Sequence, residues 1–212
     1  MLHPGKMLIK ALARAAANSA AMPPASRGCE PPVPGPHAAY IPNVVVHTHR
    51  GQTARFYDDL IRQRIVLINC MSIRDEASCS NMETVAQLQP LIGEDLGRSV
   101  FIYSLTTDPE HDTAAALRRF AEKYNARDGW LFLTGDPAEL MTLRARLFTH
   151  DGGQDCSMHL IRYGNEAVGV WGGVSVMIGA KSIAQRVQWI TPREAPAGSP
   201  TRGGPSPLSA EG

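Results

Sequence analysis

The chain has 212 residues, of which 43% are hydrophobic and 19% charged, an ordinary composition for one globular domain with a full core. Its 21 basic and 20 acidic side chains leave a formal net charge of +1, so no long-range field gathers nucleic acid or an anionic membrane. The sequence has no basic stripe with interleaved aromatics to support nucleic-acid binding, and no apolar run approaching the roughly 18 residues of a membrane span.

The two ends of the chain differ in composition from its centre. Residues 22–38 and the tail after Ile190 are rich in proline, glycine and serine, which is typical of unpacked chain. Lys6 and Lys10 precede a mostly apolar stretch that loosely resembles an export signal. We therefore expect three parts: a disordered leader or degenerate signal at 1–39, one folded domain at 40–190, and a disordered tail at 191–212.

The first predicted elements are a hairpin and a buried strand. Two short strands, Val44–Val46 and a segment around Ala54–Phe56, flank the turn sequence His49–Gln52. The run Ile65–Ile68 is entirely aliphatic, which predicts a strand that is covered on both faces. A helix is expected from about Ser80, because apolar residues recur at helical spacing beyond it.

Two further strand–helix pairs follow. Ser99–Leu105 is the next buried strand, and Asp112 or Thr113 can cap the helix after it. Trp130–Leu133 is a short strand, and the helix Pro137–Leu147 begins with proline in its first turn.

The last expected elements are a second hairpin and a helix. The strands Leu160–Tyr163 and Ala167–Trp171 are joined by a tight turn at Gly164-Asn165, and the helix spans Lys181–Trp189. This alternation requires an α/β sheet with helices on its faces. A thioredoxin-like fold fits the order, with a mixed sheet between an N-terminal and a C-terminal antiparallel hairpin, although periodicity alone leaves a flavodoxin-like sheet open.

Four strings within residues 40–190 resemble the SCO/SenC family and occur in the family's order. They are Pro42–Val45 leading to Arg55–Leu60; Ser104–Thr113, which fits S-x-x-x-D-P-E-x-D-T; Trp130–Gly135, which fits W-x-x-L-T-G; and the hairpin sequence Arg162–Glu166. Each string alone is a weak signal, and the ordered set is a strong one.

This resemblance implies a three-layer thioredoxin-like fold and a role in copper handling. SCO/SenC proteins are exported or membrane-tethered and bring copper, or reducing equivalents, to the copper site of cytochrome c oxidase. Their site has two cysteines in a C-x-x-x-C motif at the start of the first helix and a distal histidine before the C-terminal hairpin. Thiolate and imidazole are soft enough to hold Cu(I). For this chain the resemblance implies a periplasmic or cell-envelope location.

The motif is altered in this chain. Aligning the preceding strand places the C-x-x-x-C window on Asp75–Cys79, so the second cysteine is kept as Cys79 and the first is replaced by Asp75. A carboxylate is a hard ligand that discriminates poorly in favour of Cu(I), and it cannot form a disulfide. Cys79 at a helix N-terminus is favoured as thiolate and is the best nucleophile of the chain, although Asp75 and Glu76 oppose that effect.

The partner of Cys79 is left open by the sequence. An ungapped match puts Ser157 at the distal histidine position, with Cys156 and His159 on either side, so either can supply a second soft donor. Cys70 is nearer in sequence, but a strand-end cysteine is more often a core residue than a ligand or disulfide partner. The candidate metal ligands are therefore Cys79, Cys156, His159 and Asp75.

Other histidines have simpler interpretations. His111 is expected in a capped turn before a helix rather than in a metal cluster, and His47 and His49 are expected on the surface.

Three functions fit these residues. The first is a copper-binding protein that assists assembly of a respiratory oxidase, with an oxidase subunit or another copper carrier as partner. The second is a thiol oxidoreductase or peroxidase that uses Cys79 as nucleophile, with Cys70 or Cys156 as resolving thiol. The third is a non-catalytic relative that binds a partner without metal. The resemblance favours a metallochaperone over an enzyme.

Overall fold

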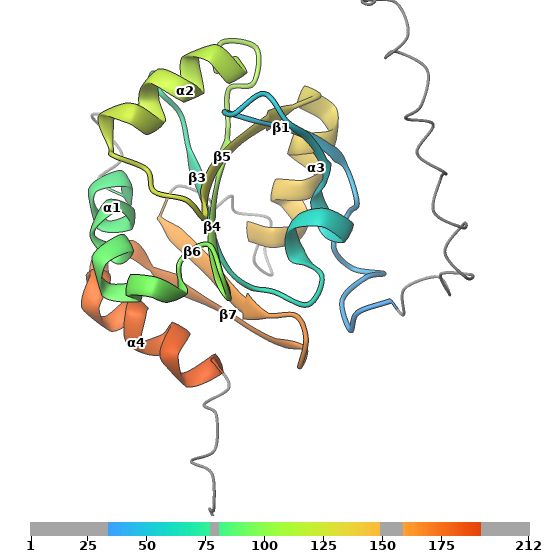
Figure 1. Cartoon of the computed structure of the whole chain (residues 1–212). Coiled ribbons are helices and arrows are strands. Elements are labelled where there is room, and N and C mark those ends of the chain that lie inside the picture. The colour runs from blue at the N-terminus through green and yellow to red at the C-terminus, as the bar shows by residue number, and fades with distance from the viewer. Residues whose placement is uncertain (1–33, 77–80, 149–158, 192–212) are drawn as a thin grey trace, which may run out of the picture. The chain divides into compact units, whose positions relative to one another are not determined.

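The computed structural model describes residues 34–76, 81–148 and 159–191 (Figure 1). All of them fall in one unit that begins at Pro34. The strands are β1 (Val45–Thr48), β2 (Thr53–Arg55), β3 (Ile65–Met71), β4 (Val100–Thr106), β5 (Trp130–Gly135), β6 (Leu160–Asn165) and β7 (Val170–Ser175). The α-helices are α1 (Asn81–Ile92), α2 (Ala114–Lys123), α3 (Pro137–Phe148) and α4 (Ala180–Ile190). Shorter turns of helix are the π-helix η1 (Phe56–Ile61) and the 3-10 helices η3 (Gly93–Asp95) and η4 (Val176–Ile178).

The strands form one mixed sheet in the order β2-β1-β5-β4-β3-β6-β7. Its centre is parallel, with β3 beside β4 and β4 beside β5. An antiparallel hairpin lies at each edge, β1–β2 at one and β6–β7 at the other. The predicted α/β thioredoxin-like fold is confirmed, including both hairpins.

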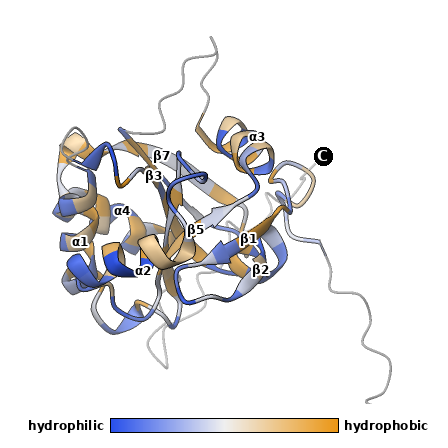
Figure 2. Ribbon diagram, turned by 90° about the horizontal axis from the view of Figure 1, so that it is seen from above, coloured by the Kyte–Doolittle hydropathy of each residue, from blue (hydrophilic) through white to orange (hydrophobic). Residues whose placement is uncertain are grey.

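Helices cover both faces of the sheet and make the three layers (Figure 1). One face packs against α1, α2 and α4, and the other against α3 and η1. In Figure 2, α1 is orange and blue along its length, as expected of a helix with one face on a core. Every residue of β3 is buried, which confirms the expected doubly covered strand.

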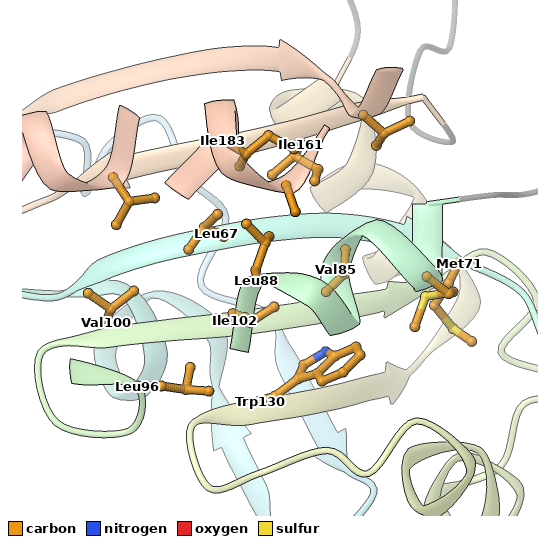
Figure 3. Close-up of a cluster of buried hydrophobic side chains, with 14 of the residues drawn as sticks. Leu67, Met71, Val85, Leu88, Leu96, Val100, Ile102, Trp130, Ile161 and Ile183 are labelled. Atoms are coloured by element: carbon orange, nitrogen blue, oxygen red, sulfur yellow. The ribbon is translucent and has the colours of Figure 1, made fainter. Parts of the chain in front are cut away.

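Side chains from helices and strands interdigitate on the first of these faces. Val85 and Leu88 of α1 point toward Leu67 of β3 and Ile102 of β4 (Figure 3). Trp130 of β5 is fully buried at the same face. Burying a valine or leucine side chain is worth about 1.5–3 kcal/mol, so the contacts of Val85 and Leu88 fix α1 on the sheet.

The second hairpin differs from the sequence expectation. Gly164 and Asn165 lie in β6, and the turn is formed by the four residues that follow, 166–169. A Cβ at position 164 would overlap the Trp171 ring, so this glycine serves a close packing contact. Gly169 has a φ of +68° and supplies the turn conformation instead.

His49 is a second correction, because it is buried rather than on the surface. Its Nδ1 accepts a hydrogen bond from the Phe132 amide at 3.1 Å, and its ring packs edge-on against the Phe132 ring. Burial first, and then the charges of Arg50 and Arg118, lower the pKa of His49 from 6.5 to about 4. His49 is therefore a neutral core residue at neutral pH.

The described chain makes ordered contacts before residue 40. The carboxylate of Glu166 is fully buried and accepts hydrogen bonds from the His37 amide at 2.7 Å and from His37 Nδ1 at 3.0 Å. It also accepts from Tyr57 Oη and Trp171 Nε1, each at 2.7 Å. Residues 34–39, which the sequence assigns to the leader, are thus tied to η1 and to the β6–β7 hairpin. The domain limits of 40 and 190 stay predictions.

Candidate metal site

The segment leading toward Cys79 is anchored by a buried carboxylate. Asp112 accepts a hydrogen bond from Thr106 Oγ1 at 2.6 Å and one from the amide of Ile73 at 3.3 Å. Burial raises the pKa of Asp112, and these two hydrogen bonds offset only part of that effect. The loop 72–76 is therefore held against the end of β4.

Asp112 is consequently not the cap of α2. Thr113 caps that helix by accepting from the amide of Ala116 at 3.3 Å. The sequence left both residues open as caps, and it gave no sign that Asp112 reaches back to the loop after β3.

A second carboxylate, that of Asp108, forms an ion pair with the same loop. Asp108 pairs with Arg74 at 3.3 Å and with His111 Nδ1 at 2.7 Å. The hydrogen bond from His111, more than the charge of Arg74, lowers the pKa of Asp108. His111 lies in the expected turn before α2 and is engaged with this aspartate.

Glu76 ties the end of the described loop to α2. Lys123 Nζ lies 2.6 Å from both of its carboxylate oxygens, and the Tyr124 hydroxyl donates to one of them. Burial alone would raise the pKa of Glu76, but the bonds from Lys123 and Tyr124 outweigh it and lower that pKa. The negative charge of Glu76 is thus paired, which weakens its expected opposition to a Cys79 thiolate.

Asp75 is exposed, and its amide donates to Ser72 Oγ at 3.4 Å. The sequence alignment predicts it at the position of the first cysteine of the C-x-x-x-C motif.

A buried polar chain lies beneath the start of α1. Trp130 Nε1 donates to Ser104 Oγ at 2.9 Å, and Ser104 Oγ donates to Asn69 Oδ1 at 2.8 Å. Asn81 Nδ2, at the first residue of α1, donates to the carbonyl of Cys70 at 2.7 Å. Satisfied buried polar groups favour a single arrangement. These bonds therefore fix the N-terminal end of α1 relative to the end of β3.

Cys70 faces away from α1. It is fully buried and packs in the cluster that includes Ile68 and Leu105, on the face covered by α3 and η1. Its neighbours along β3, Asn69 and Met71, point to the other face. A core-packing role agrees with this orientation.

His159 lies at the start of β6 and is exposed. Its carbonyl accepts a hydrogen bond from the amide of Val176 at 3.0 Å. The antiparallel register pairs Ile68 with Arg162, so the start of β6 runs beside the end of β3. The segment carrying His159 and the segment carrying Asp75 therefore lie at the same end of the sheet.

Cys79 and Cys156 lie outside the described residues. Within 34–76, 81–148 and 159–191 no group of three or more His, Cys, Asp or Glu side chains is placed to hold a metal. In the same ranges, no helix has the length and hydrophobicity needed to cross a bilayer.

Comparison with known proteins decides between the sheet types that periodicity left open. The SCO1/SenC family model matches residues 72–154, which include the loop, α1, β4 and β5 described above. Over these residues the chain is similar to the SCO1/SenC family. A search of curated protein sequences gives no match.

Solved Sco structures share the fold over most of the domain. A SCO1/SenC family lipoprotein from Bacillus anthracis is 15% identical, with a TM-score of 0.56, covering 77% of this chain and 99% of that chain. BsSco, described as a Sco-family cytochrome c oxidase assembly protein with a disulfide switch, is 18% identical, with a TM-score of 0.57 and coverage of 76% and 96%. Yeast Sco1 with copper bound is 12% identical, with a TM-score of 0.53 and coverage of 73% and 93%. These likenesses establish the Sco fold.

Proposed function

We propose that this Sco-like protein binds a copper ion as cargo and assists the assembly of a respiratory cytochrome oxidase. The central donor in this proposal is the thiolate of Cys79, and Cys156 and His159 supply the soft donors from the facing segment. An oxidase subunit or another copper carrier receives the ion, and the site of action is the periplasm or cell envelope.

The observation that supports the proposal is that two segments leave the sheet at the same end. The loop after β3 is held there by Asp112 and precedes Cys79 in the sequence. The start of β6 lies beside the end of β3 through the β3–β6 register and follows Cys156 in the sequence. This shared end of the sheet supports the proposal that donors from 75–79 and from 156–159 converge on one ion.

The donor types fit Cu(I) unequally. Thiolate sulfur and imidazole nitrogen are soft or borderline ligands and suit Cu(I), whereas the Asp75 carboxylate is hard. We therefore assign Asp75 a minor part as a ligand. Because Asp75 cannot form a disulfide with Cys79, any redox cycle would need Cys156 as the second sulfur.

The test is a Cu(I) titration of reduced protein under anaerobic conditions against a competing chelator. Stoichiometric binding is expected for the full chain. Cys79→Ser should lower the affinity by more than the roughly 10–100-fold typical of losing an outer-shell partner. His159→Ala, which removes a proposed direct ligand, should lower it by at least roughly tenfold. Cys29→Ser, outside the predicted domain, serves as the matched control and should leave the affinity unchanged.

The same variants separate the other two functions. A Cys79-dependent disulfide after mild peroxide treatment, without Cu(I) uptake, would replace the proposal with a thiol oxidoreductase. Absence of copper uptake and of any disulfide, with partner binding intact in a Cys79→Ser, Cys156→Ser double variant, would replace it with a metal-free binding role.

A further inference from the structure

A groove of about 660 Å³ lies at the end of the sheet opposite to the candidate metal site. It is bordered by the loop that joins η1 to β3, by the start of β4 and by the β6–β7 turn. Three guanidinium groups line it, those of Arg62, Arg64 and Arg98, and the one carboxylate in the lining is Asp58. Positive charge is concentrated here, in a chain whose net charge is only +1.

Arg64 is held in place by its backbone, by an aromatic ring and by a hydrogen bond between its guanidinium and the hydroxyl of Tyr103. Its amide donates to the carbonyl of Ile61 at 3.0 Å, and its carbonyl accepts from the amide of Glu166 at 3.0 Å. Its guanidinium lies 4.6 Å from the centre of the Phe101 ring. Among the described residues no carboxylate forms an ion pair with Arg64. A stacked, half-buried guanidinium that has no counter-ion is already organised to receive an anion.

The other two arginines of the groove lining are only loosely paired. Arg62 lies 3.9 Å from Asp58 and Arg98 lies 3.9 Å from Glu94, distances too long for hydrogen bonds. Asp58 itself accepts a hydrogen bond of 2.6 Å from Asn43 Nδ2. The local charge is therefore not cancelled by tight pairing within the groove.

The backbone beside the groove is unusual in two ways. The segment Phe56–Ile61 is a π-helix, a rare form that occurs often at functional sites. Gln63, which also lines the groove, has a φ of 58°, in the left-handed region that non-glycine residues seldom adopt. These two features shape the short loop that carries Arg62 and Arg64, and both arginines line the groove.

From these observations we infer that the groove binds the oxyanion group of a ligand, a phosphate or a carboxylate, with Arg64 as its central contact. Guanidinium groups match such groups with paired N–H donors. The site is separate from the proposed copper site and does not depend on it, because it lies at the other end of β3.

The experiment is an NMR titration of the full chain at constant ionic strength, with inorganic phosphate in one arm and succinate in the other. A saturable shift of the amides at 62–65 and 98–101 is expected with at least one probe. Binding of phosphate alone identifies a phosphorylated ligand class, and binding of succinate alone identifies a carboxylate class.

Variants test the central contact. Arg64→Gln should weaken binding by roughly tenfold, and Arg64→Lys should not restore it, because lysine lacks the stacked paired donors. Arg119→Gln removes an exposed arginine of α2 outside the groove and should leave binding unchanged. If Arg64→Gln does not fold, the Arg62→Gln, Arg98→Gln double variant should show the same loss. No saturable shift with either probe, or an equal loss in Arg119→Gln, would overturn the inference.

Discussion

Glu166 and Asp112 are both buried carboxylates, and they lie at opposite ends of the central sheet. Glu166 accepts hydrogen bonds from an amide, an imidazole, a phenol and an indole. Burial alone would raise its pKa, but the bonds from the His37 amide, Trp171 and Tyr57 outweigh that effect and lower it. Asp112 accepts from one hydroxyl and one amide, and burial raises its pKa.

The difference shows that the number of surrounding hydrogen-bond donors determines which buried carboxylates stay charged. A carboxylate keeps its charge where enough protein donors replace the water that it loses. Glu166 has enough such donors, and its hydrogen bonds link the residues around His37 to η1 and to the β6–β7 hairpin. Asp112 has fewer such donors and holds the loop before Cys79 by fewer bonds. Substitutions and pH titrations test this difference between the two carboxylates.

The largest expected effect is that of Glu166→Gln. The amide group of glutamine would point a donor at groups that are themselves donors, and the charge that they solvate would be gone. We expect the free energy of unfolding to fall by about 3 kcal/mol in a denaturant titration. The exposed Glu122→Gln, on α2, is the control and should change stability little. A loss for Glu166→Gln no larger than that of the control would contradict this stabilising role of the Glu166 hydrogen bonds.

In an acid titration, the contributions of the two carboxylates to the free energy of unfolding should change in opposite directions with pH. Since the pKa of Glu166 is lowered on folding, its contribution is present above the pKa of the unfolded chain and is lost as the pH falls through the folded value. Since the pKa of Asp112 is raised, its contribution is present at low pH and is lost as the pH rises through the folded value. Stability curves of Glu166→Gln and Asp112→Asn, each subtracted from the wild-type curve, measure the two slopes.

His49 extends the comparison to a buried base. Its pKa is lowered from 6.5 to about 4, so the unfolded chain takes up the proton first as the pH falls. The stability that this shift contributes is complete above pH 6.5 and declines between pH 6.5 and 4. His49→Gln, which can still accept from Phe132, should flatten the wild-type curve over that interval. The exposed His47→Gln should leave the slope as it is.

The smallest effect is expected for Asp112→Asn. The asparagine oxygen can still accept from Thr106 and Ile73, and no strongly held charge is removed. We expect a loss of about 1 kcal/mol, measured by thermal unfolding near neutral pH. A loss as large as that of Glu166→Gln would mean that Asp112 is charged and fully solvated by the protein, against the comparison.

The sequence predicted the fold where local pattern and tertiary packing agree. Ile65–Ile68 has the pattern of a strand covered on both faces, and β3 is such a strand. Gly164-Asn165 is a strong turn signal, yet the Trp171 ring packs on Gly164 and keeps both residues in β6. The contacts that displaced the turn join residues from different elements, and periodicity does not contain them.

For the candidate site, the sequence predicted which segments contribute to it but not the hydrogen bonds that hold them. The order of the family strings placed the loop before Cys79 and the start of β6 in one fold, and the β3–β6 register puts both at the same end of the sheet. Asp112 accepts from Ile73, 39 residues away, and Glu166 from His37, 129 residues away, and a sequence pattern does not reveal such partners.

The proposal that soft donors from the Cys79 and Cys156–His159 segments converge on one copper ion is tested most directly by X-ray absorption on Cu(I)-loaded protein. We predict sulfur together with nitrogen or a second sulfur in the first shell, and a smaller sulfur signal in Cys79→Ser. A copper ion surrounded only by oxygen and nitrogen in the wild type, or the same sulfur signal in Cys79→Ser, would contradict the account.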